Sequence, residues 1–371
     1  MKVAIIMSLA EQRGGAELML MHLLRANRTG PQVEYHLAFL ESGPMVEEAA
    51  ALGYSVQVFP AGQIRQAHRQ LSTVWALKRW MQRQRIDVAM SWMAKAHLYA
   101  GPAAKMVGIP SVWWQHNIPD GHWLGRWATL IPAKRIFCCS QAAQQAQQKL
   151  KPRRKTSIIY PAVDLGLLTP TSLPCPAEAR RMLGLPETGS IIGAVCRLQH
   201  SKGVHIFLDA AAEIARTRSD VHFVVVGGKH ALEPDYPNVL ASQVEALGLS
   251  KKVCFTGYQA NTELWMQAMN IVVLPSIGTE SFGMVIIEGM ALGKTVIASR
   301  SGGPQEIIED GIDGYLTERG NTSLLAKTIQ QIIEEQYQQS ELQAAARRKA
   351  SFFNTERLAL EVARSLQMML L

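Results

Sequence analysis

The sequence lacks the signatures of several protein classes. Its five cysteines are scattered and odd in number, and none has the Cys-x-x-Cys spacing of a metal or redox site. No apolar run approaches the ~20 residues that span a bilayer. HExxH, Asp-x-Asp, GxSxG and GxGxxG motifs are also missing, so we expect no bound metal, no cofactor and no dinucleotide fingerprint. These absences favour a reduced, cytoplasmic protein.

What is present indicates a two-domain enzyme. The chain has 371 residues, more than one domain usually holds, with 48% hydrophobic and 18% charged residues. Its net charge of +8 suits a phosphate-bearing substrate or an anionic membrane surface. Nucleic acid is disfavoured as a partner because no recognition motif accompanies the charge.

The first half alternates apolar strands with helices, which predicts a parallel sheet covered on both faces. The first of these strands, at 3–7, has the apolar character of a signal core, but no cleavage site follows it, and we interpret it as buried. The predicted strands are 3–7, 34–40, 55–59, 88–92, 111–116, 135–139 and 157–160. The predicted helices are 15–28, 44–52, 66–85, 95–107 and 140–150.

A proline-containing link at 164–176, which includes Pro170, predicts a domain boundary, and a second alternating series follows it. Its predicted strands are 191–196, 222–226, 253–255, 271–274 and 295–298. Its predicted helices start near 204, 238, 261, 283 and 304, and the tail from 321 is helical. We therefore expect a doubly wound domain at 1–165, a second at 166–354, and a ligand cleft at the carboxyl ends of the strands.

The second series carries two kinds of charged motif. Arg197 and Lys202 flank a short loop after a buried strand, and together they suit a diphosphate. A solvated basic loop is the alternative. Glu280 precedes a helix start and Glu288 lies inside that apolar helix, where an unpaired carboxylate is costly. Carboxylates accept hydrogen bonds from sugar or ribose hydroxyls, but Glu288 paired with a buried cation and Glu280 capping a helix are the alternatives.

Three further features are weaker. The Gly302-Gly303 turn permits close backbone approach, but a turn without a ligand is the commoner explanation of this motif taken alone. Arg13-Gly14-Gly15 opens the first helix and could meet a phosphate. His116 ends a strand, where packing is the commoner role.

A basic amphipathic helix lies at 66–85 and suits contact with an anionic membrane. An ordinary surface helix with a buried apolar side is the alternative. Its cations are Arg65, His68, Arg69, Lys78, Arg79, Arg83 and Arg85. Its apolar residues are Leu71, Val74, Trp75, Leu77, Trp80 and Met81, and Trp113, Trp114, Trp123 and Trp127 follow in the sequence.

Together these motifs resemble the retaining glycosyltransferases of family four, which have the GT-B fold. The resemblance rests on segments 14–17, 197–203, 224–227, 255–257, 274–276, 280–293 and 302–306. It departs at Cys196, Gly289 and Lys294-Thr295, where the family usually has Gly, Ala and a Pro-containing turn. None of these departures removes a charged or hydrogen-bonding group.

The resemblance implies two Rossmann-like domains that face a central cleft, with a nucleotide-diphosphate sugar, UDP- or GDP-linked, in the second. The resemblance implies that Arg197 and Lys202 bind the diphosphate and that Glu288 binds the ribose hydroxyls. The donor sugar is assigned to Glu280 and the segment that contains Phe282, Gly283, Met284 and Val285. Gly15 would approach the phosphates, His116 would lie near the reacting sugar, and the helix at about 355–371 would pack back on the first domain. The candidate catalytic residues are thus Glu280, Lys202, Arg197 and His116.

The implied reaction is retaining, metal-independent transfer of a sugar to an acceptor hydroxyl on a cell-surface glycan or glycolipid precursor. The implied location is cytoplasmic, with contact at the inner face of the membrane as a further expectation. An epimerase or hydrolase of the same fold, or a non-catalytic nucleotide-sugar-binding module, is the alternative. No residue that we interpret specifies the base, the sugar or the acceptor.

Overall fold

The computed structural model describes residues 1–11, 14–30, 33–62, 67–119, 121, 123–150, 154–169, 172–335 and 339–370. Arg13, Arg65 and Pro170 lie outside these ranges. The chain folds into two compact units, Met1–Ala162 with Thr355–Leu371, and Val163–Asn354. The boundary at 162/163 is three residues before the one that the sequence predicts, and the second boundary falls at the predicted place.

The first unit is built on a seven-stranded parallel sheet in the order β3-β2-β1-β4-β5-β6-β7. Its strands are β1 (Lys2–Met7), β2 (Glu34–Phe39), β3 (Ser55–Val58), β4 (Val88–Trp92), β5 (Ser111–Gln115), β6 (Arg135–Cys138) and β7 (Lys155–Ile158). Its helices are α1 (Gly15–Asn27), α2 (Pro44–Ala51), α3 (Ala67–Gln84), α4 (Met93–Val107), α5 (Trp123–Leu130), α6 (Gln141–Lys149) and α15 (Thr355–Gln367).

The central strand β1 is apolar from Val3 to Met7 because both faces of the sheet are covered there. Val3, Ile5 and Met7 of β1 lie in one core cluster, whereas Ala4 and Ile6 lie in another on the opposite face. Successive strand residues point to opposite faces, so a strand that is buried on both sides shows no polar alternation. The continuous apolar pattern predicted a parallel sheet, and the structure confirms this prediction.

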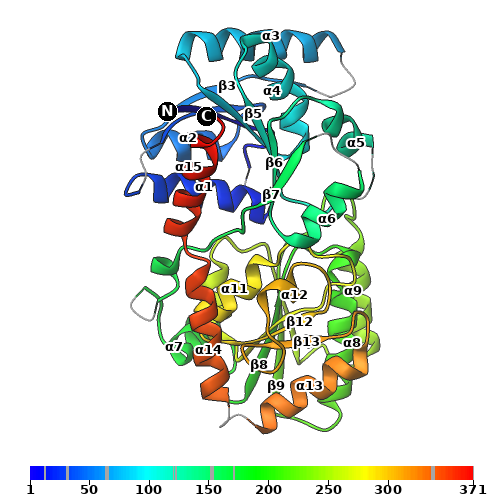
Figure 1. Cartoon of the computed structure of the whole chain (residues 1–371). Helices are drawn as coiled ribbons and strands as arrows, with labels where there is room; N and C mark the ends of the chain where they lie inside the picture. The colour runs from blue at the N-terminus through cyan, green and yellow to red at the C-terminus, as the bar shows by residue number, and fades with distance from the viewer. Residues whose placement is uncertain are drawn as a thin grey trace. The chain divides into compact units, whose positions relative to one another are not determined.

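The last helix, α15, belongs to the first unit although it comes from the far end of the chain. Its residues Leu358, Val362 and Leu366 are fully buried in the same core cluster as β1 and α1. In Figure 1 this red helix lies beside the blue α1, and the two helices pack against each other. Arg357 adds bonds to the carbonyls of Tyr160 (2.8 Å) and Pro161 (2.9 Å).

The second unit holds a six-stranded parallel sheet in the order β10-β9-β8-β11-β12-β13. Its strands are β8 (Ser190–Val195), β9 (Val221–Val226), β10 (Val253–Gly257), β11 (Ile271–Leu274), β12 (Thr295–Ser299) and β13 (Tyr315–Thr317). Its helices are η1 (Leu165–Leu167), α7 (Pro176–Met182), η2 (His200–Lys202), α8 (Val204–Ala215), α9 (Tyr236–Ala246), α10 (Thr262–Ala268), α11 (Met284–Ala291), α12 (Pro304–Ile307), α13 (Thr322–Glu334) and α14 (Gln339–Phe352).

Two doubly wound α/β units confirm the predicted fold class. The sequence interpretation omitted α5, α7 and β13. Each is eight residues or shorter, and a segment of that length gives too few repeats of a hydrophobic period to identify. None of the helices within the described ranges is long and apolar enough to cross a membrane.

Candidate functional site

The second sheet reverses its winding between β8 and β11. Strands β9 and β10 lie on one side of β8, and β11, β12 and β13 continue on the other side. Loops at such a point diverge above the carboxyl edge and leave room for a ligand. Arg197 follows β8 and Glu280 follows β11, so the topology brings the two charged motifs to one place.

Arg197 and Lys202 follow β8, which ends at Val195. Arg197 is exposed, and Lys202 ends the short η2 turn. Gly203 then takes φ +70°, and a Cβ there would lie 2.0 Å from the carbonyl oxygen of Pro275. Only glycine permits this approach, so the turn that carries Lys202 is held against the end of β11.

Glu280 is held in place by the Gly302-Gly303 turn that follows β12. Its backbone N–H donates to the Ser301 carbonyl (3.2 Å) and the Ser301 hydroxyl (3.1 Å), and its carbonyl accepts from Gly303 N–H (3.0 Å). A Cβ on Gly303 would lie 2.3 Å from the Phe282 backbone at its Cα. Gly303 therefore permits a close backbone approach, and what it approaches is the Glu280 loop.

Glu280 and Lys202 form an ion pair. Nζ of Lys202 lies 2.7 Å from Oε2 of Glu280, and the side chains are 21% and 11% exposed. Ser276 donates to the same oxygen at 2.9 Å. Burial raises the pKa of Glu280, but Lys202, Ser276 and Arg197 outweigh burial and hold this pKa below its ordinary value. The carboxylate is ionised, and Oε1 accepts no hydrogen bond from a described residue.

The helix α11 begins directly after this loop. Its N-cap is Gly283, at φ +101°, and Met284 and Val285 form its first turn. The first amides of a helix lack intrahelical acceptors and favour an anion. Phe282 is buried against Phe353, with ring centroids 5.6 Å apart. The alternative in which Glu280 caps this helix is wrong, since glycine occupies the N-cap.

Glu288 lies in the second turn of α11 and is partly buried. Burial, with a smaller contribution from Glu263, raises its pKa to about 7. The described residues give its carboxylate no hydrogen bond or ion pair, so the alternative of a buried cationic partner is not supported there. A carboxylate held in this way suits a pair of donating hydroxyls.

Gly15 and His116 belong to the first unit. Gly15 is the first residue of α1, and Gly14 is its N-cap. His116 follows β5, is 6% exposed, and has its ring between Trp92 (centroids 4.8 Å apart) and Trp114 (5.2 Å). Burial lowers its pKa to about 3, so the imidazole is neutral.

The basic helix α3 divides its apolar residues between the core and the surface. Val74, Leu77, Trp80 and Met81 are buried in the first unit, as the surface-helix alternative expected. Leu71 (63% exposed) and Trp75 (48% exposed) remain outside. Trp113 and Trp114 are fully buried and add nothing to this surface, in contrast to the exposed Trp123 and Trp127 of α5.

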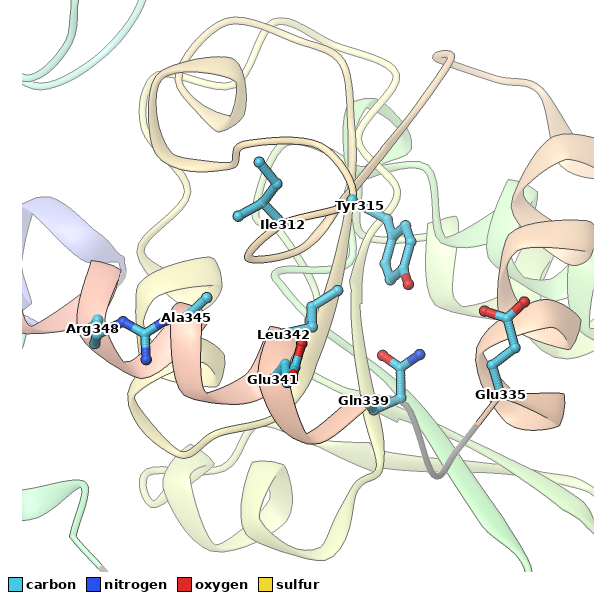
Figure 2. Close-up of a pocket in the computed structure, with 9 residues that line it drawn as sticks. Ile312, Tyr315, Glu335, Gln339, Glu341, Leu342, Ala345 and Arg348 are labelled. Atoms are coloured by element: carbon cyan, nitrogen blue, oxygen red, sulfur yellow. The ribbon is translucent and has the colours of Figure 1, made fainter.

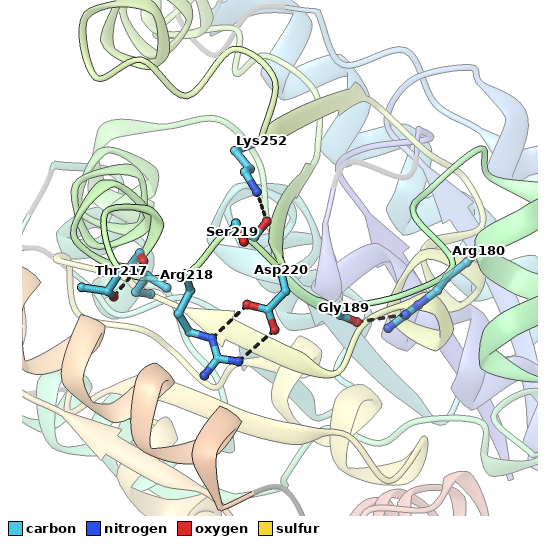
Figure 3. Close-up of polar contacts among 8 residues, drawn as sticks. Arg180, Gly189, Thr217, Arg218, Ser219, Asp220 and Lys252 are labelled. Atoms are coloured by element: carbon cyan, nitrogen blue, oxygen red, sulfur yellow. Dashed lines mark hydrogen bonds and ion pairs between the residues drawn. The ribbon is translucent and has the colours of Figure 1, made fainter.

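A cavity and a group of charged residues in the second unit lie away from this site. A cavity of about 400 Å³ is bordered by β13, α14 and the end of α13, and Figure 2 shows Glu335, Gln339 and Tyr315 at one end of it. No sequence-predicted site residue lines it. At the amino edge of the sheet, Arg218 pairs with Asp220 (2.8 Å) and Lys252 contacts the Ser219 carbonyl (Figure 3). These contacts fix the strand starts.

Two residues that contact predicted site residues, Ser276 and Trp92, are absent from the predictions made from the sequence. Ser276, which donates to Glu280, stands in a Pro-Ser pair that suggests only a turn. Trp92 has the appearance of a core residue in an apolar strand. Among the described residues, no group of three or more His, Cys, Asp and Glu side chains is placed to hold a metal ion.

Two family models match this chain. The model for group 1 glycosyl transferases matches residues 177–350, and the model for glycosyltransferase family 4 matches residues 13–167. The chain belongs to the glycosyltransferases that these two models describe, those of group 1 and family 4. The family to which the motifs point is thereby confirmed.

The curated relatives are D-inositol 3-phosphate glycosyltransferases. That of Corynebacterium urealyticum is 32% identical over 58% of this chain and 53% of its own length. That of Thermobifida fusca is 28% identical over 69% of this chain and 63% of its own. The chain thus spans about half the length of the first of these curated relatives and under two thirds of the second.

A solved structure matches over the whole chain. It is the crystal structure of HepE from Anabaena in complex with UDP and glucose, with a TM-score of 0.87, 27% identity and 99% coverage of both chains. The same protein is also known in complex with UDP-glucose. A glycosyltransferase from Rickettsia africae, at 20% identity and a TM-score of 0.88, shares the fold.

Proposed function

We propose that this chain transfers a sugar from a nucleotide-diphosphate sugar to an acceptor hydroxyl, with retention of anomeric configuration and without a metal. The observation that carries the proposal is the convergence of Arg197, Lys202 and an ionised Glu280 at the switch point of the second sheet. The similarity to HepE, which binds UDP-glucose, supports a UDP-linked donor.

The charges of the site are arranged for a leaving diphosphate. The ammonium of Lys202 has three N–H donors, and one of them donates a hydrogen bond to Glu280. Its remaining donors and the guanidinium of Arg197 suit the negative charge that develops on the diphosphate as the sugar departs. Because these two cations supply the positive charge, we propose that the reaction needs no metal.

Glu280 and Glu288 hold hydroxyls in this proposal. Oε2 of Glu280 is already occupied by Lys202 and Ser276, so Oε1 is the atom offered to a hydroxyl of the donor sugar. Glu288 takes the ribose. Neither carboxylate serves as a nucleophile. The acceptor proton passes to the departing phosphate oxygen, in a front-face displacement that keeps the anomeric configuration.

The test is direct. A thermal-shift screen against UDP-, GDP- and ADP-sugars identifies the donor, because ligand binding stabilises the folded state with the logarithm of saturation. The chosen donor is then incubated with candidate acceptors, and the products are followed by proton NMR. An acceptor-linked product with the donor's anomeric configuration supports the proposal. Free sugar, an epimer, an inverted product, or no turnover with any pair would contradict it.

We infer that the acceptor is a glycan or glycolipid precursor at an anionic membrane. The support is α3, where exposed Leu71 and Trp75 lie among Arg69, Arg79 and other cations. Lys78 Nζ lies 4.6 Å from the Trp75 ring centre, so apolar and positive groups share this surface. Co-sedimentation with vesicles containing anionic lipid at low salt checks this, with Arg79→Glu as the weakened variant. Protein that stays in solution would refute it.

A further inference from the structure

Trp92 occupies the switch point of the first sheet. Strands β2 and β3 continue on one side of β1, and β5, β6 and β7 continue beyond β4 on the other. The chain leaving β1 leads to Gly15 and α1, and β4 ends at Trp92, whose side chain is fully buried. Trp92 is thus placed where a doubly wound unit builds ligand contacts.

The backbone at this point has an unusual conformation. Helix α4 begins at Met93, the residue directly after β4, and Met93 has φ +73°. This left-handed conformation is uncommon for residues other than glycine, and it persists only where the surroundings fix it. Strand and helix are therefore joined without a loop, which restricts the backbone at Trp92.

Trp92 contacts His116 directly, and it contacts Ala16, the residue that follows Gly15. Its Nε1 donates to the carbonyl of Ala16, in the first turn of α1, at 2.9 Å. Its ring lies 4.8 Å from His116 and 4.8 Å from Trp114, measured between centroids. One side chain therefore links the start of α1, where Gly15 lies, to the imidazole.

The His116 ring depends on these aromatic neighbours for its orientation. Its Nε2 is buried and makes no hydrogen bond to a described residue. The Trp92 and Trp114 rings cover it at interplanar angles of 31° and 23°. Among the described residues, the packed rings hold the imidazole without a hydrogen bond at Nε2.

We propose that Trp92 is a positioning residue for glycosyl transfer, which holds Gly15 and His116 as one unit through its indole N–H and its ring. This inference rests on the proposed function. The indole bond fixes the first turn of α1, and the ring fixes the imidazole. Loss of the N–H alone should therefore loosen the helix start and lower turnover, without affecting binding contacts made by the second unit.

Trp113 provides a matched control. It is the neighbour of Trp114 in β5, is fully buried like Trp92, and its Nε1 has no hydrogen-bond partner among the described residues. Its ring stacks on His97, on the opposite face of the sheet from Trp92 (centroids 5.4 Å apart, 10°). Trp92→Phe and Trp113→Phe remove the same atoms from the core of one sheet, but only the first removes a bond to α1.

The experiment compares the two variants. Amide exchange at residues 14–19 should rise at least tenfold in Trp92→Phe and stay within twofold in Trp113→Phe. Turnover should fall at least tenfold only in Trp92→Phe. Equal exchange in the two variants, or turnover in Trp92→Phe that stays within twofold of wild type, would overturn the proposal.

Exchange at residues 14–19 needs no activity, so it tests Trp92 even if the chain transfers no sugar, a result that would refute the proposed function instead. If Trp92→Phe does not fold, benzothienylalanine at position 92 keeps the indole shape and replaces only the N–H with sulfur. The same rise in exchange supports the proposal, and unchanged exchange refutes it.

Discussion

The switch point of the second sheet is charged, whereas that of the first sheet is aromatic and neutral. Arg197, Lys202 and Glu280 meet at the second, and Trp92 and His116 meet at the first. In the proposed reaction the two sheets have different roles. The charged groups would bind and neutralise the diphosphate, and the packed rings would orient His116 without adding charge.

The largest expected effect concerns the charged site. Lys202→Ala removes the ammonium that the proposal places on the leaving diphosphate. We expect turnover to fall by about 10²–10³-fold, since loss of one preorganised charge-stabilising group has a cost of this size. The measurement is the initial rate at saturating donor and acceptor.

Lys252→Ala is the control for Lys202→Ala. Lys252 also contacts a carbonyl of the second unit, but at the amino edge of the sheet. Its turnover should stay within about twofold of wild type, because it lies outside the site and exposed contacts contribute little. Equal rates in the two variants would remove Lys202 from the mechanism.

A second prediction uses the pKa of Glu288, which is raised to about 7. If ribose hydroxyls donate to the ionised carboxylate, binding selects that form. The affinity for UDP-glucose should then be about tenfold weaker at pH 6 than at pH 8. Calorimetric titration measures it, and Glu288→Gln should flatten the pH dependence. The same pH dependence in the Gln variant would assign it to another group.

Glu288 and His97 should give the free energy of unfolding opposite dependences on pH. The pKa of Glu288 in the folded chain lies above the ordinary value of 4.5. The contribution of Glu288 to the free energy of unfolding is therefore complete below pH 4.5 and is lost as the pH rises through 7. Glu288→Gln should therefore reduce the loss of stability between pH 5 and pH 8 by about 2–3 kcal/mol. Denaturant unfolding at the two pH values provides the measurement.

His97 of the first unit gives the opposite sign. Burial lowers its pKa from 6.5 to about 4, so its contribution is present above pH 6.5 and is lost as the pH falls through 4. His97→Phe keeps a ring against Trp113 and should reduce the loss of stability between pH 7.5 and pH 5 by about 2 kcal/mol. An unchanged acid sensitivity would mean that other groups, such as His116, account for it.

The sequence predicted the fold and the charged residues for a physical reason. Strands buried on both faces are apolar throughout, and charges that follow them stand out against that background. The geometry of Glu280 could not be read in the same way. Its pairing with Lys202 and Ser276 depends on glycine contacts between loops that are distant in sequence, such as that of Gly303 with Phe282.

His116 was predicted from the sequence, but its neighbours Trp92 and Trp114 could not be, because they have the character of core residues. Trp92 and Trp114 continue apolar strands, and nothing in the pattern separates them from Trp113. The hydrogen bond to Ala16, the ring contact with His116 and the φ of Met93 distinguish Trp92. Long-range contacts and backbone dihedral angles are properties of the folded chain.

The central claim is the location of the donor site, and amide exchange with and without saturating UDP-glucose tests it most directly. The account predicts that protection appears at residues 196–203 and 280–286, at the carboxyl ends of β8 and β11. Residues 217–220 at the amino edge should be unaffected. Protection centred on Ile312, Tyr315 and Leu342, around the cavity beside α14, with none at 196–203 or 280–286, would contradict the account.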